Sequence, residues 1–394
     1  MSSASATTDR SPVPFFSQAR SFEELWPVIS AHVEEIVERG KYSHGRKVAE
    51  LERAIASWTG AKHAIAVNSG TDALVLALRA CGIEPGDEVA VPAYTFVASA
   101  SSVMLARARP LLVDIEPDSY AMDPAALSSV AGERTRAVMP VHLFCQLADM
   151  DAIGAVAGRI GAVVVEDSAE AIGMRWNGVH AGLLGRAGVL SFFPTKTLGA
   201  VGDAGMILTN DDEVAASAGI LRHHGRLGRT IDHIAGISNL SGASGTNSKM
   251  DDVQAAVLLA KLSRLDADIA RRAELAAAYS ERLRDVSGVV KLPTMVRRTA
   301  DSAPVHYVYV IEVERRDQLV GHLGALGIGT EVYYPTPLHL QPCFAELGHR
   351  RGDFPVAEAA ATRAVALPLY ADLAIEQVDV VCDAIRRFYD GGAA

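Results

Sequence analysis

Three segments of the chain place reactive or anion-binding residues directly after predicted strands. Asp167 follows an apolar run at residues 162–166, and Lys196 comes shortly after a second run at 189–193. A third run leads into residues 69–71, the sequence Ser-Gly-Thr, at the predicted start of a helix. In open α/β sheets, ligands bind beyond the carboxyl ends of the strands. We therefore expect an acid, an amine and a helix N-terminus to meet there.

This combination of groups is suited to pyridoxal phosphate. Lys196 would form a Schiff base with it, and Asp167 would keep the pyridine nitrogen protonated so that the ring accepts electrons. The backbone N–H groups and the dipole of the helix would hold the phosphate. We expect burial to lower the pKa of Lys196, which would free its amine for nucleophilic attack and proton transfer.

Each of these groups also has a simpler interpretation when it is taken alone. A lysine in a glycine-rich loop is most often a solvated surface residue, and an aspartate after a strand is often a helix cap. The Ser-Gly-Thr sequence before a helix is more often simple capping than an anion site. The spacing alone therefore leaves a structural role open for all three groups.

The elements that must position these groups follow an alternating pattern. Strands are predicted at residues 62–67, 88–91, 111–115, 137–143, 162–166, 189–193 and 206–209, with helical segments between most of them. One helix is expected to stop at Gly60, and Asp123-Pro124 has the cap-then-proline pattern of a helix start. Strands that are apolar throughout are typical of a parallel sheet covered on both faces, so the pattern predicts a doubly wound α/β domain.

The pattern changes beyond residue 250. A long helical stretch is followed by a strand at 305–313, a helix at 317–326, a strand at 328–333 and a terminal helix at 375–388. We divide the chain into a flexible leader, a large cofactor-binding α/β domain, a long connecting helix and a small C-terminal α+β domain, with the boundaries 1–20, 21–250, 251–286 and 287–394.

The composition narrows the class of protein. The 394-residue chain has 37 Lys and Arg against 47 Asp and Glu, a formal net charge of −10, which argues against nucleic-acid binding. No apolar run approaches the roughly 18 residues of a membrane span, so no membrane contact is expected. The beginning of the sequence lacks the features of a secretion signal, and we expect a cytoplasmic protein. The cysteines form no CxxC pair, and we expect buried thiols and no metal site at Cys81, Cys145, Cys343 and Cys382.

Several common motifs are absent from the sequence, which contains no GxGxxG, GxxxxGK[ST], HExxH or GxSxG pattern. These absences weigh against an NTPase and against a nicotinamide-dependent oxidoreductase. Because single motifs can be degenerate, a nicotinamide enzyme on a doubly wound sheet stays open as a rival of a different class.

Longer stretches of the sequence match a known family. They are residues 67–74 (VNSGTDAL), 92–99 (PAYTFVAS), 141–150, 165–173 (VEDSAEAIG), 191–205 (SFFPTKTLGAVGDAG), 245–256 (GTNSKMDDVQAA), 333–344 and 367–370 (LPLY). Together they resemble the DegT-type sugar aminotransferases, which are pyridoxal-phosphate enzymes of fold type I, the aspartate-aminotransferase fold. The resemblance implies a large domain with a mainly parallel sheet and a smaller α+β domain.

The resemblance also implies roles for the residues of the cofactor site. Lys196 would carry the cofactor, Asp167 would face its ring nitrogen, and Phe96 would stack on the ring. The groups that bind the phosphate would be Gly70, Thr71, Ser191 and, from the neighbouring subunit, Asn247. A homodimer with active sites at its interface is therefore expected.

Other positions depart from the family or match it less firmly. Glu170 stands where a glutamine or histidine is common near the phenolic oxygen of the cofactor, and a carboxylate would repel that oxygen unless one of the two carries a proton. Lys249 replaces the usual arginine and keeps a positive charge for a diphosphate without the bidentate fork. His306 and His339 match positions near the sugar-nucleotide pocket, and a structural role for these histidines is an equal alternative.

The activity implied by the resemblance is transamination of a nucleotide-linked keto-deoxysugar, with glutamate as the expected amino donor. The expected substrate is dTDP-4-keto-6-deoxyglucose, aminated at C4 in the biosynthesis of deoxysugars for antibiotics. Amination at C3 and a cyclitol ketone substrate are alternatives. A dehydrating branch of the family has histidine in place of the cofactor lysine, so Lys196 argues against it. A non-catalytic regulatory relative is the remaining rival.

Overall fold

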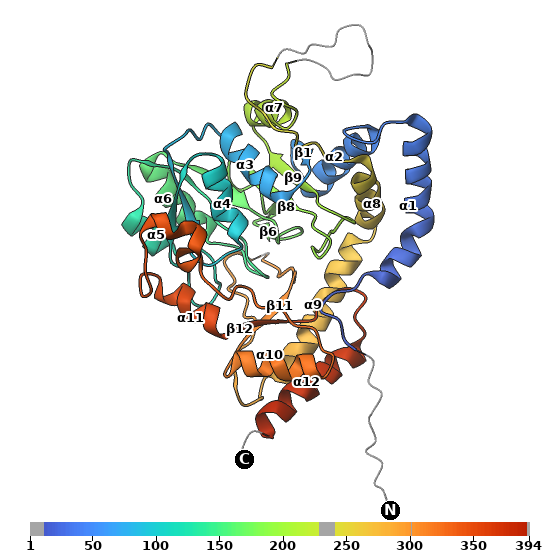
Figure 1. Ribbon diagram of the computed structural model, residues 1–394, viewed down its shortest axis with the longest axis vertical. Coiled ribbons are helices and arrows are strands. Elements are labelled where there is room, and N and C mark those ends of the chain that lie inside the picture. The colour runs from blue at the N-terminus through green and yellow to red at the C-terminus, as the bar shows by residue number, and fades with distance from the viewer. Residues whose placement is uncertain (1–11, 228–240, 301, 392–394) are drawn as a thin grey trace, which may run out of the picture.

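The computed structural model describes residues 12–227, 241–300 and 302–391 (Figure 1). Its large domain is built on a seven-stranded sheet with the strand order β1-β9-β8-β5-β4-β2-β3. The strands are β1 (His63–Val67), β2 (Glu88–Pro92), β3 (Arg109–Val113), β4 (Thr135–Val138), β5 (Val163–Asp167), β8 (Ala187–Ser191) and β9 (Gly205–Thr209). Strand β9 runs antiparallel to β1 and β8, and the other neighbouring pairs are parallel. The predicted, mainly parallel α/β sheet is confirmed.

Helices cover both faces of this sheet. They include α2 (Arg46–Thr59), α3 (Gly70–Ala80), α4 (Val97–Leu105), α5 (Pro124–Val130), α6 (Met150–Ile160) and α7 (Asp212–Leu221). Val89 and Val91 of β2 belong to the core cluster that contains α3 and α4, whereas Ala90 between them packs with α5 and α6. Burial on both faces explains why these strands are continuous apolar runs in the sequence.

Two predicted helix boundaries are confirmed in detail. Helix α2 ends at Gly60, which has a φ of +85° that an L side chain rarely adopts. Helix α5 begins with Pro124, and the side chain of Asp123 accepts a hydrogen bond from the N–H of Ala125 at 2.8 Å. A short hairpin, β6 (Arg175–Trp176) and β7 (Val179–His180), follows β5.

The single connecting helix predicted over residues 251–286 is two helices in the structure. Helix α8 (Asp252–Leu262) ends at Ser263, and α9 (Leu265–Leu283) begins after Arg264. The hydroxyl of Ser263 donates to the carbonyl of Ala260 at 2.7 Å, and such a bond competes with the backbone ladder at the break. Figure 1 shows α9 running from the large domain to the small one.

The small domain contains a three-stranded antiparallel sheet with the order β10-β11-β12. The elements of this region are β10 (Val289–Lys291), β11 (Tyr309–Val313), α10 (Arg316–Ala325), the 3₁₀ helices η1 (Leu338–Leu340) and η2 (Pro342–Leu347), α11 (Pro355–Arg363), β12 (Ala364–Leu367) and α12 (Ile375–Asp390). Tyr279 of α9, Leu319 of α10 and Val381 of α12 share its core. The strand predicted at 328–333 is present as isolated bridges at Ile328 and Glu331.

The beginning of the chain is partly packed. Residues 1–11 of the predicted flexible leader lie outside the described residues, but Val13 is 1% exposed and forms a bridge with Ile328. The ring of Phe15 lies edge-on to that of Tyr333, with 6.2 Å between the ring centres. Helix α1 (Ala19–Arg39), which the sequence analysis did not predict, packs on α8. The leader prediction is therefore wrong from residue 12 onward, because these apolar side chains are used in the fold.

The cysteines follow the prediction except at one position. Cys81, Cys145 and Cys382 are buried thiols, whereas Cys343 is exposed. Cys343 lies in the short helix η2, where the next residue, Phe344, takes the buried position instead. Over residues 12–227, 241–300 and 302–391, no helix combines the length and apolar character that a membrane crossing requires.

Candidate active site

One cavity brings together most of the residues that the sequence analysis singled out. It has a volume of about 510 Å³ and lies at the carboxyl ends of β1, β5 and β8. Among the side chains and backbone groups that line it are those of Gly70, Thr71, Asp167, Glu170, Ser191 and Lys196. The expected amine, acid and helix N-terminus are therefore neighbours in space.

The first turn of α3 forms one end of this cavity. Ser69 caps the helix, and its side-chain oxygen accepts a hydrogen bond from the N–H of Asp72 at 3.1 Å. A Cβ atom at Gly70 would lie 2.9 Å from the Cβ of Ser191, so glycine lets the helix approach the end of β8 closely. The N–H groups of a first helical turn have no acceptor within the helix, and together with the Ser191 hydroxyl they suit an anion.

Asp167 is held at the end of β5 by two hydrogen-bond donors. Its Oδ2 accepts from the hydroxyl of Ser99, on α4, at 2.7 Å, and its Oδ1 accepts from the N–H of Ala169 at 3.2 Å. The aspartate is 5% exposed and lines the cavity. Its carboxylate is therefore fixed in direction before any ligand binds.

Lys196 lies beside Glu170. Its Nζ is 3.4 Å from the Oε1 of Glu170 and 4.1 Å from the centre of the Tyr307 ring. The other carboxyl oxygen of Glu170, Oε2, accepts a hydrogen bond from the N–H of Phe144 at 2.9 Å. The carboxyl group of Glu170 thus bridges the lysine and the backbone that follows β4.

The charges in this cavity influence one another. Burial raises the pKa of Glu170, and Lys196 opposes this rise. Burial by itself would lower the pKa of Lys196, but the interactions with Tyr307, Glu170 and Asp167 outweigh it, so that the pKa of the lysine is raised. The expected lowering of this pKa is therefore wrong, because the ring of Tyr307 and the carboxyl groups of Glu170 and Asp167 share the cavity with the amine.

Aromatic side chains form another part of the cavity wall. Phe96 is 56% exposed, and its ring lies 6.1 Å from that of Tyr334. The sequence analysis gave no role to Tyr307, Tyr333 or Tyr334, which also line the cavity. Tyr94 holds the peptide between the last two: its hydroxyl accepts from the N–H of Tyr334 at 2.9 Å and donates to the carbonyl of Tyr333.

Asn247 and Lys249 lie outside this cavity within a single chain. Asn247 is exposed, and the Nζ of the half-buried Lys249 donates to its side-chain oxygen. A backbone bridge joins Lys249 to Val67 at the end of β1, so the segment runs beside the start of the anion cradle. Its polar side chains nevertheless do not line the wall that Lys196 lines.

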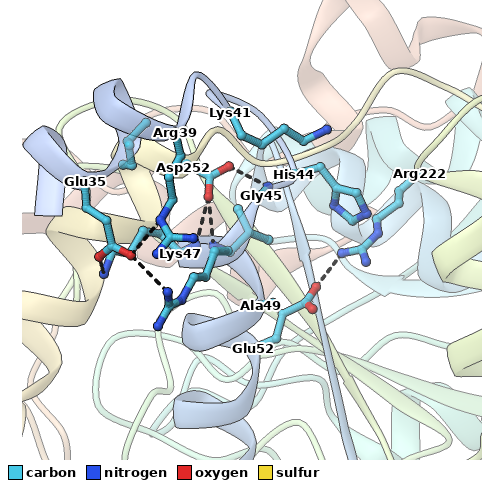
Figure 2. Close-up of a pocket in the computed structure, with 13 residues that line it drawn as sticks. Glu35, Arg39, Lys41, His44, Gly45, Lys47, Ala49, Glu52, Arg222 and Asp252 are labelled. Carbon is cyan, nitrogen blue, oxygen red and sulfur yellow. Dashed lines mark hydrogen bonds and ion pairs between the residues drawn. The ribbon is translucent and has the colours of Figure 1, made fainter. Parts of the chain in front are cut away.

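Lysine, arginine and histidine side chains lie around this segment, and we call this group the basic cluster. Its members are Lys41, His44, Arg222, His223, Arg226 and Lys249. The first three line a second cavity of about 740 Å³ between α1, α2 and α8, where Figure 2 shows them close together. Burial, followed by the charge of Arg222, lowers the pKa of His44 to about 4, and burial and Arg226 lower that of Lys249.

Neither of the two predicted substrate histidines lines the cavity of Lys196. His306 directly precedes Tyr307; its Nδ1 has no hydrogen-bond partner in the described part of the chain, and burial lowers its pKa to about 4. His339 is 2% exposed, and its Nε2 lies 2.9 Å from the carboxylate of Glu358. The contact with Glu358 joins η1 to α11.

The residues present fit pyridoxal phosphate. The N-terminus of α3 and Ser191 provide an anion site, Lys196 provides an amine for the aldehyde, and the fixed carboxylate of Asp167 provides a partner for the ring nitrogen. The sheet presents all of them at the carboxyl ends of its strands, where such folds bind ligands. The fold and the cavity together define an aminotransferase that depends on pyridoxal phosphate.

Comparison with known proteins identifies the family. Residues 27–386 match the DegT/DnrJ/EryC1/StrS aminotransferase family. The chain is 42% identical to the "Pleiotropic regulatory protein" of Geobacillus stearothermophilus, over 96% of this chain and 98% of that protein. It is 38% identical to the dTDP-3-amino-3,4,6-trideoxy-alpha-D-glucose transaminase of Streptomyces venezuelae, over 98% of each. The chain belongs to the DegT/DnrJ/EryC1/StrS aminotransferase family.

Comparison of the structure with solved structures identifies the same family. The crystal structure of S. venezuelae DesV in complex with a ketimine intermediate matches this chain with a TM-score of 0.89 and 38% identity, over 96% of this chain and 99% of that one. Other similar chains have been solved with pyridoxamine phosphate or in a pyridoxal-phosphate form. These findings confirm the predicted fold, the cofactor and the class of sugar aminotransferase, and the nicotinamide-dependent alternative is wrong.

Proposed function

We propose that this aminotransferase moves an amino group from glutamate to the keto group of a nucleotide-linked deoxysugar. The observation that carries the proposal is that Lys196, Asp167 and the N-terminus of α3 line one cavity of about 510 Å³. Pyridoxal phosphate, when bound, supplies an electron-accepting ring that stores the amino group between the two half-reactions. The names of relatives, such as the transaminase of S. venezuelae, support a sugar nucleotide as the acceptor.

Lys196 has two tasks in this proposal. It binds the cofactor and, once the amino donor has displaced it, moves a proton to and from the reacting carbon of donor and acceptor. Such positioned proton transfer contributes about 10²- to 10⁴-fold to a rate. Glu170, 3.4 Å from the Nζ of Lys196 and with a pKa raised by burial, is placed to hold a proton. A protonated Glu170 would not repel the phenolic oxygen of the cofactor.

The phosphate of the cofactor is assigned to the cradle of Gly70, Thr71 and Ser191. Asn247 is proposed to reach the same phosphate from a second copy of the chain, since in its own chain it is exposed and outside the cavity. A homodimer would then complete each site with a polar group that one chain alone does not supply.

The diphosphate of the sugar nucleotide is assigned to the basic cluster. Lys249 lies next to Asn247 and is repelled by Arg226, and its neighbours Lys41 and Arg222 add to this repulsion. An anion between these side chains would offset the repulsion. His306 is proposed as a further substrate contact because it adjoins Tyr307 of the cavity wall, whereas the contact of His339 with Glu358 favours a structural role.

The carbon atom that receives the amino group is the most specific part of the proposal. The sequence motifs favour dTDP-4-keto-6-deoxyglucose and amination at C4. Three relatives have names that specify 3-amino sugars linked to dTDP, and these names favour amination at C3. A cyclitol ketone is the third acceptor to be tested. The three acceptors differ in the position of the new amine, so product analysis separates them.

The experiment is an amination assay with the purified protein, pyridoxal phosphate and glutamate. Each keto sugar is supplied in turn, and NMR of the product reads the carbon that carries the amine. Lys196→Ala should give no product and no absorption band of a lysine-bound cofactor, while Lys62→Ala, at an exposed lysine, should behave as wild type. Activity of wild-type size in Lys196→Ala would contradict the proposal.

A regulatory role without turnover is the second candidate, because a protein 42% identical to this chain bears the name "Pleiotropic regulatory protein". The presence of both Lys196 and Asp167 in one cavity favours turnover. The half-reaction with glutamate separates the two candidates: an aminotransferase converts its bound pyridoxal phosphate into the pyridoxamine form. A folded protein that binds the cofactor and leaves it unconverted under all amino donors would favour the regulatory role.

A further inference from the structure

The buried hydroxyl groups of Ser99 and Thr95 form a chain of hydrogen bonds that ends at Asp167, and no role in the proposed reaction has been assigned to them above. The Oγ of Ser99 donates to the Oδ2 of Asp167 at 2.7 Å, and the Oγ1 of Thr95 lies 3.1 Å from the Oγ of Ser99. Ser99 is 0% exposed and Thr95 is 2% exposed. Because these groups are almost completely buried, they satisfy one another's hydrogen bonds.

The chemistry of the groups sets the direction of these bonds. An ionised carboxylate only accepts, so the single hydroxyl hydrogen of Ser99 points at Asp167. The hydrogen between the two hydroxyls then comes from Thr95. The chain of donors runs one way, from Thr95 on the cavity wall through Ser99 to the carboxylate. Bonds to a charged acceptor are roughly twice as strong as neutral ones, and the Thr95 hydroxyl strengthens the last bond further.

The fold holds these three hydrogen-bonding groups in place. Thr95 directly precedes Phe96, the N-cap residue of α4, and Ser99 lies in the first turn of this helix, which brings their hydroxyl oxygens to 3.1 Å from each other. The other oxygen of Asp167 has a longer contact, 3.2 Å to the N–H of Ala169. Ser99 is therefore the closer of the two donors, and its loss would leave the carboxylate freer to turn about its own axis.

We propose that Ser99 is a positioning residue for the transamination: its hydroxyl, oriented by Thr95, fixes the Asp167 carboxylate in the direction that meets the ring nitrogen of the bound cofactor. The proposal rests on the role given above to Asp167. Ser99 itself is not part of the cavity wall and acts through the aspartate.

The test compares two serines of the same helix. Ser99→Ala removes the donor to Asp167. Ser102→Ala removes an equally buried hydroxyl that donates to the carbonyl of Ser99 at 2.9 Å and does not bond to Asp167. Each variant is measured for the dissociation constant of pyridoxal phosphate from the apoprotein, for the absorption spectrum of the loaded protein, and for kcat and KM.

We expect Ser99→Ala to bind the cofactor about tenfold more weakly, to shift its absorption bands, and to lower kcat with little change in the KM for the sugar. Ser99→Thr, which keeps the hydroxyl, should restore the spectrum, and Ser102→Ala should retain that of wild type. If Ser99→Ala does not yield folded protein, Thr95→Val removes the outer hydroxyl and should shift the spectrum in the same direction by a smaller amount.

Wild-type affinity and spectrum in Ser99→Ala would overturn the proposal, as would equal changes in Ser99→Ala and Ser102→Ala. An unchanged spectrum in Thr95→Val would do so if that variant takes the place of Ser99→Ala. If wild type shows the absorption band of a lysine-bound cofactor and Ser99→Ala has the same spectrum and affinity as wild type, this inference fails while the proposed function stands. If wild type shows no such band, the proposed function fails and this inference fails with it.

Discussion

Glu166 and Asp167 are consecutive residues of β5 whose carboxylates lie on opposite faces of the sheet. The carboxylate of Asp167 lines the cavity, and that of Glu166 is fully buried behind it. Glu166 lies at 2.6–2.9 Å from four nitrogen atoms, those of the backbone of Gly182, Leu184 and Gly185 and of the ring of His142. The buried charge therefore has the partners it needs, and it ties the segment after β7 to the strand that carries Asp167.

Glu166→Gln should lower the free energy of unfolding by about 3 kcal/mol. The amide keeps the shape of the side chain, but its NH₂ group would face N–H donors and one of its oxygens is lost. Chemical denaturation at neutral pH measures the loss. Glu133→Gln, at an exposed glutamate, is the control and should change stability by less than about 0.5 kcal/mol. A loss below about 1 kcal/mol in Glu166→Gln would show that the hydrogen bonds of Glu166 contribute little to the free energy of unfolding.

Gly70→Ala should weaken the binding of pyridoxal phosphate. The new Cβ would lie 2.9 Å from the Cβ of Ser191, and both residues line the cavity. Overpacking of this kind costs about 1–3 kcal/mol, which corresponds to roughly 5- to 150-fold in affinity if the cost falls on the bound state. Titration of the apoprotein with the cofactor measures the change.

Gly154→Ala is the matched control for this variant. Gly154 lies in the interior of α6, and a Cβ there meets nothing within 4 Å. The change should leave cofactor affinity as in wild type and raise stability by up to about 1 kcal/mol. Equal affinities in the two alanine variants would contradict the assignment of the phosphate to the turn at Gly70.

Much of the large domain was predictable because its strands are buried on both faces. The predicted runs at 162–166 and 189–193 fall within two residues of β5 and β8, and the reactive residues follow them as expected. Helix α1 was not predicted although Phe22, Leu25, Ile29, Val33 and Ile36 recur at helical spacing. The helix contains Pro27, and a proline usually marks the end of a helix rather than its interior.

The aromatic side chains that line the cavity could not be predicted from the local sequence pattern. Tyr333 and Tyr334 lie in a segment that matched the family, and Tyr307 follows His306, but nothing in a strand or loop pattern tells which of these side chains faces Lys196. That direction depends on how the small domain sits on the large one, and Tyr94 of the large domain fixes it through the peptide of the two tyrosines. The hydrogen bonds of the buried Glu166 could not be predicted either, because their donors lie in the segment that follows the β6–β7 hairpin.

Arg272→Met should destabilise the protein by about 3 kcal/mol and reduce activity as well. Arg272 is 3% exposed, and its Nη1 donates to the carbonyls of Tyr307 and Leu369, each at 2.9 Å. Loss of these bonds leaves buried carbonyls without a donor and releases the segment that carries the Tyr307 ring. Denaturation and steady-state kinetics measure both effects. Arg284→Met, at an exposed arginine, should leave both unchanged.

Stability should fall as the pH is lowered from about 6.5 towards 4, and His180 should contribute to the fall. Burial lowers the pKa of His180 from 6.5 to about 4, while its Nε2 accepts from the N–H of Gly173 at 2.8 Å. Arg175 and His142 lower the pKa further, and the bond to Ala181 and the charge of Glu166 raise it. Because the unfolded state binds the proton first, the folded state loses up to about 3 kcal/mol across this window.

His180→Gln removes this titration. The variant should be less stable than wild type at pH 7.5 and should lose less stability than wild type between pH 7.5 and pH 5. Denaturation curves at the two pH values give both numbers. His224→Gln, at an exposed histidine, should follow the wild-type slope. An unchanged slope in His180→Gln would assign the acid sensitivity to other groups.

The bridge between Val13 and Ile328 has a consequence for the order of events on the ribosome. Val13 is synthesised long before its partner Ile328, and β1 likewise waits for β9. Contacts so distant along the chain slow folding and leave early apolar segments uncovered during translation. The segment at Val13 therefore reaches its final packing only when the region around Ile328 has been synthesised.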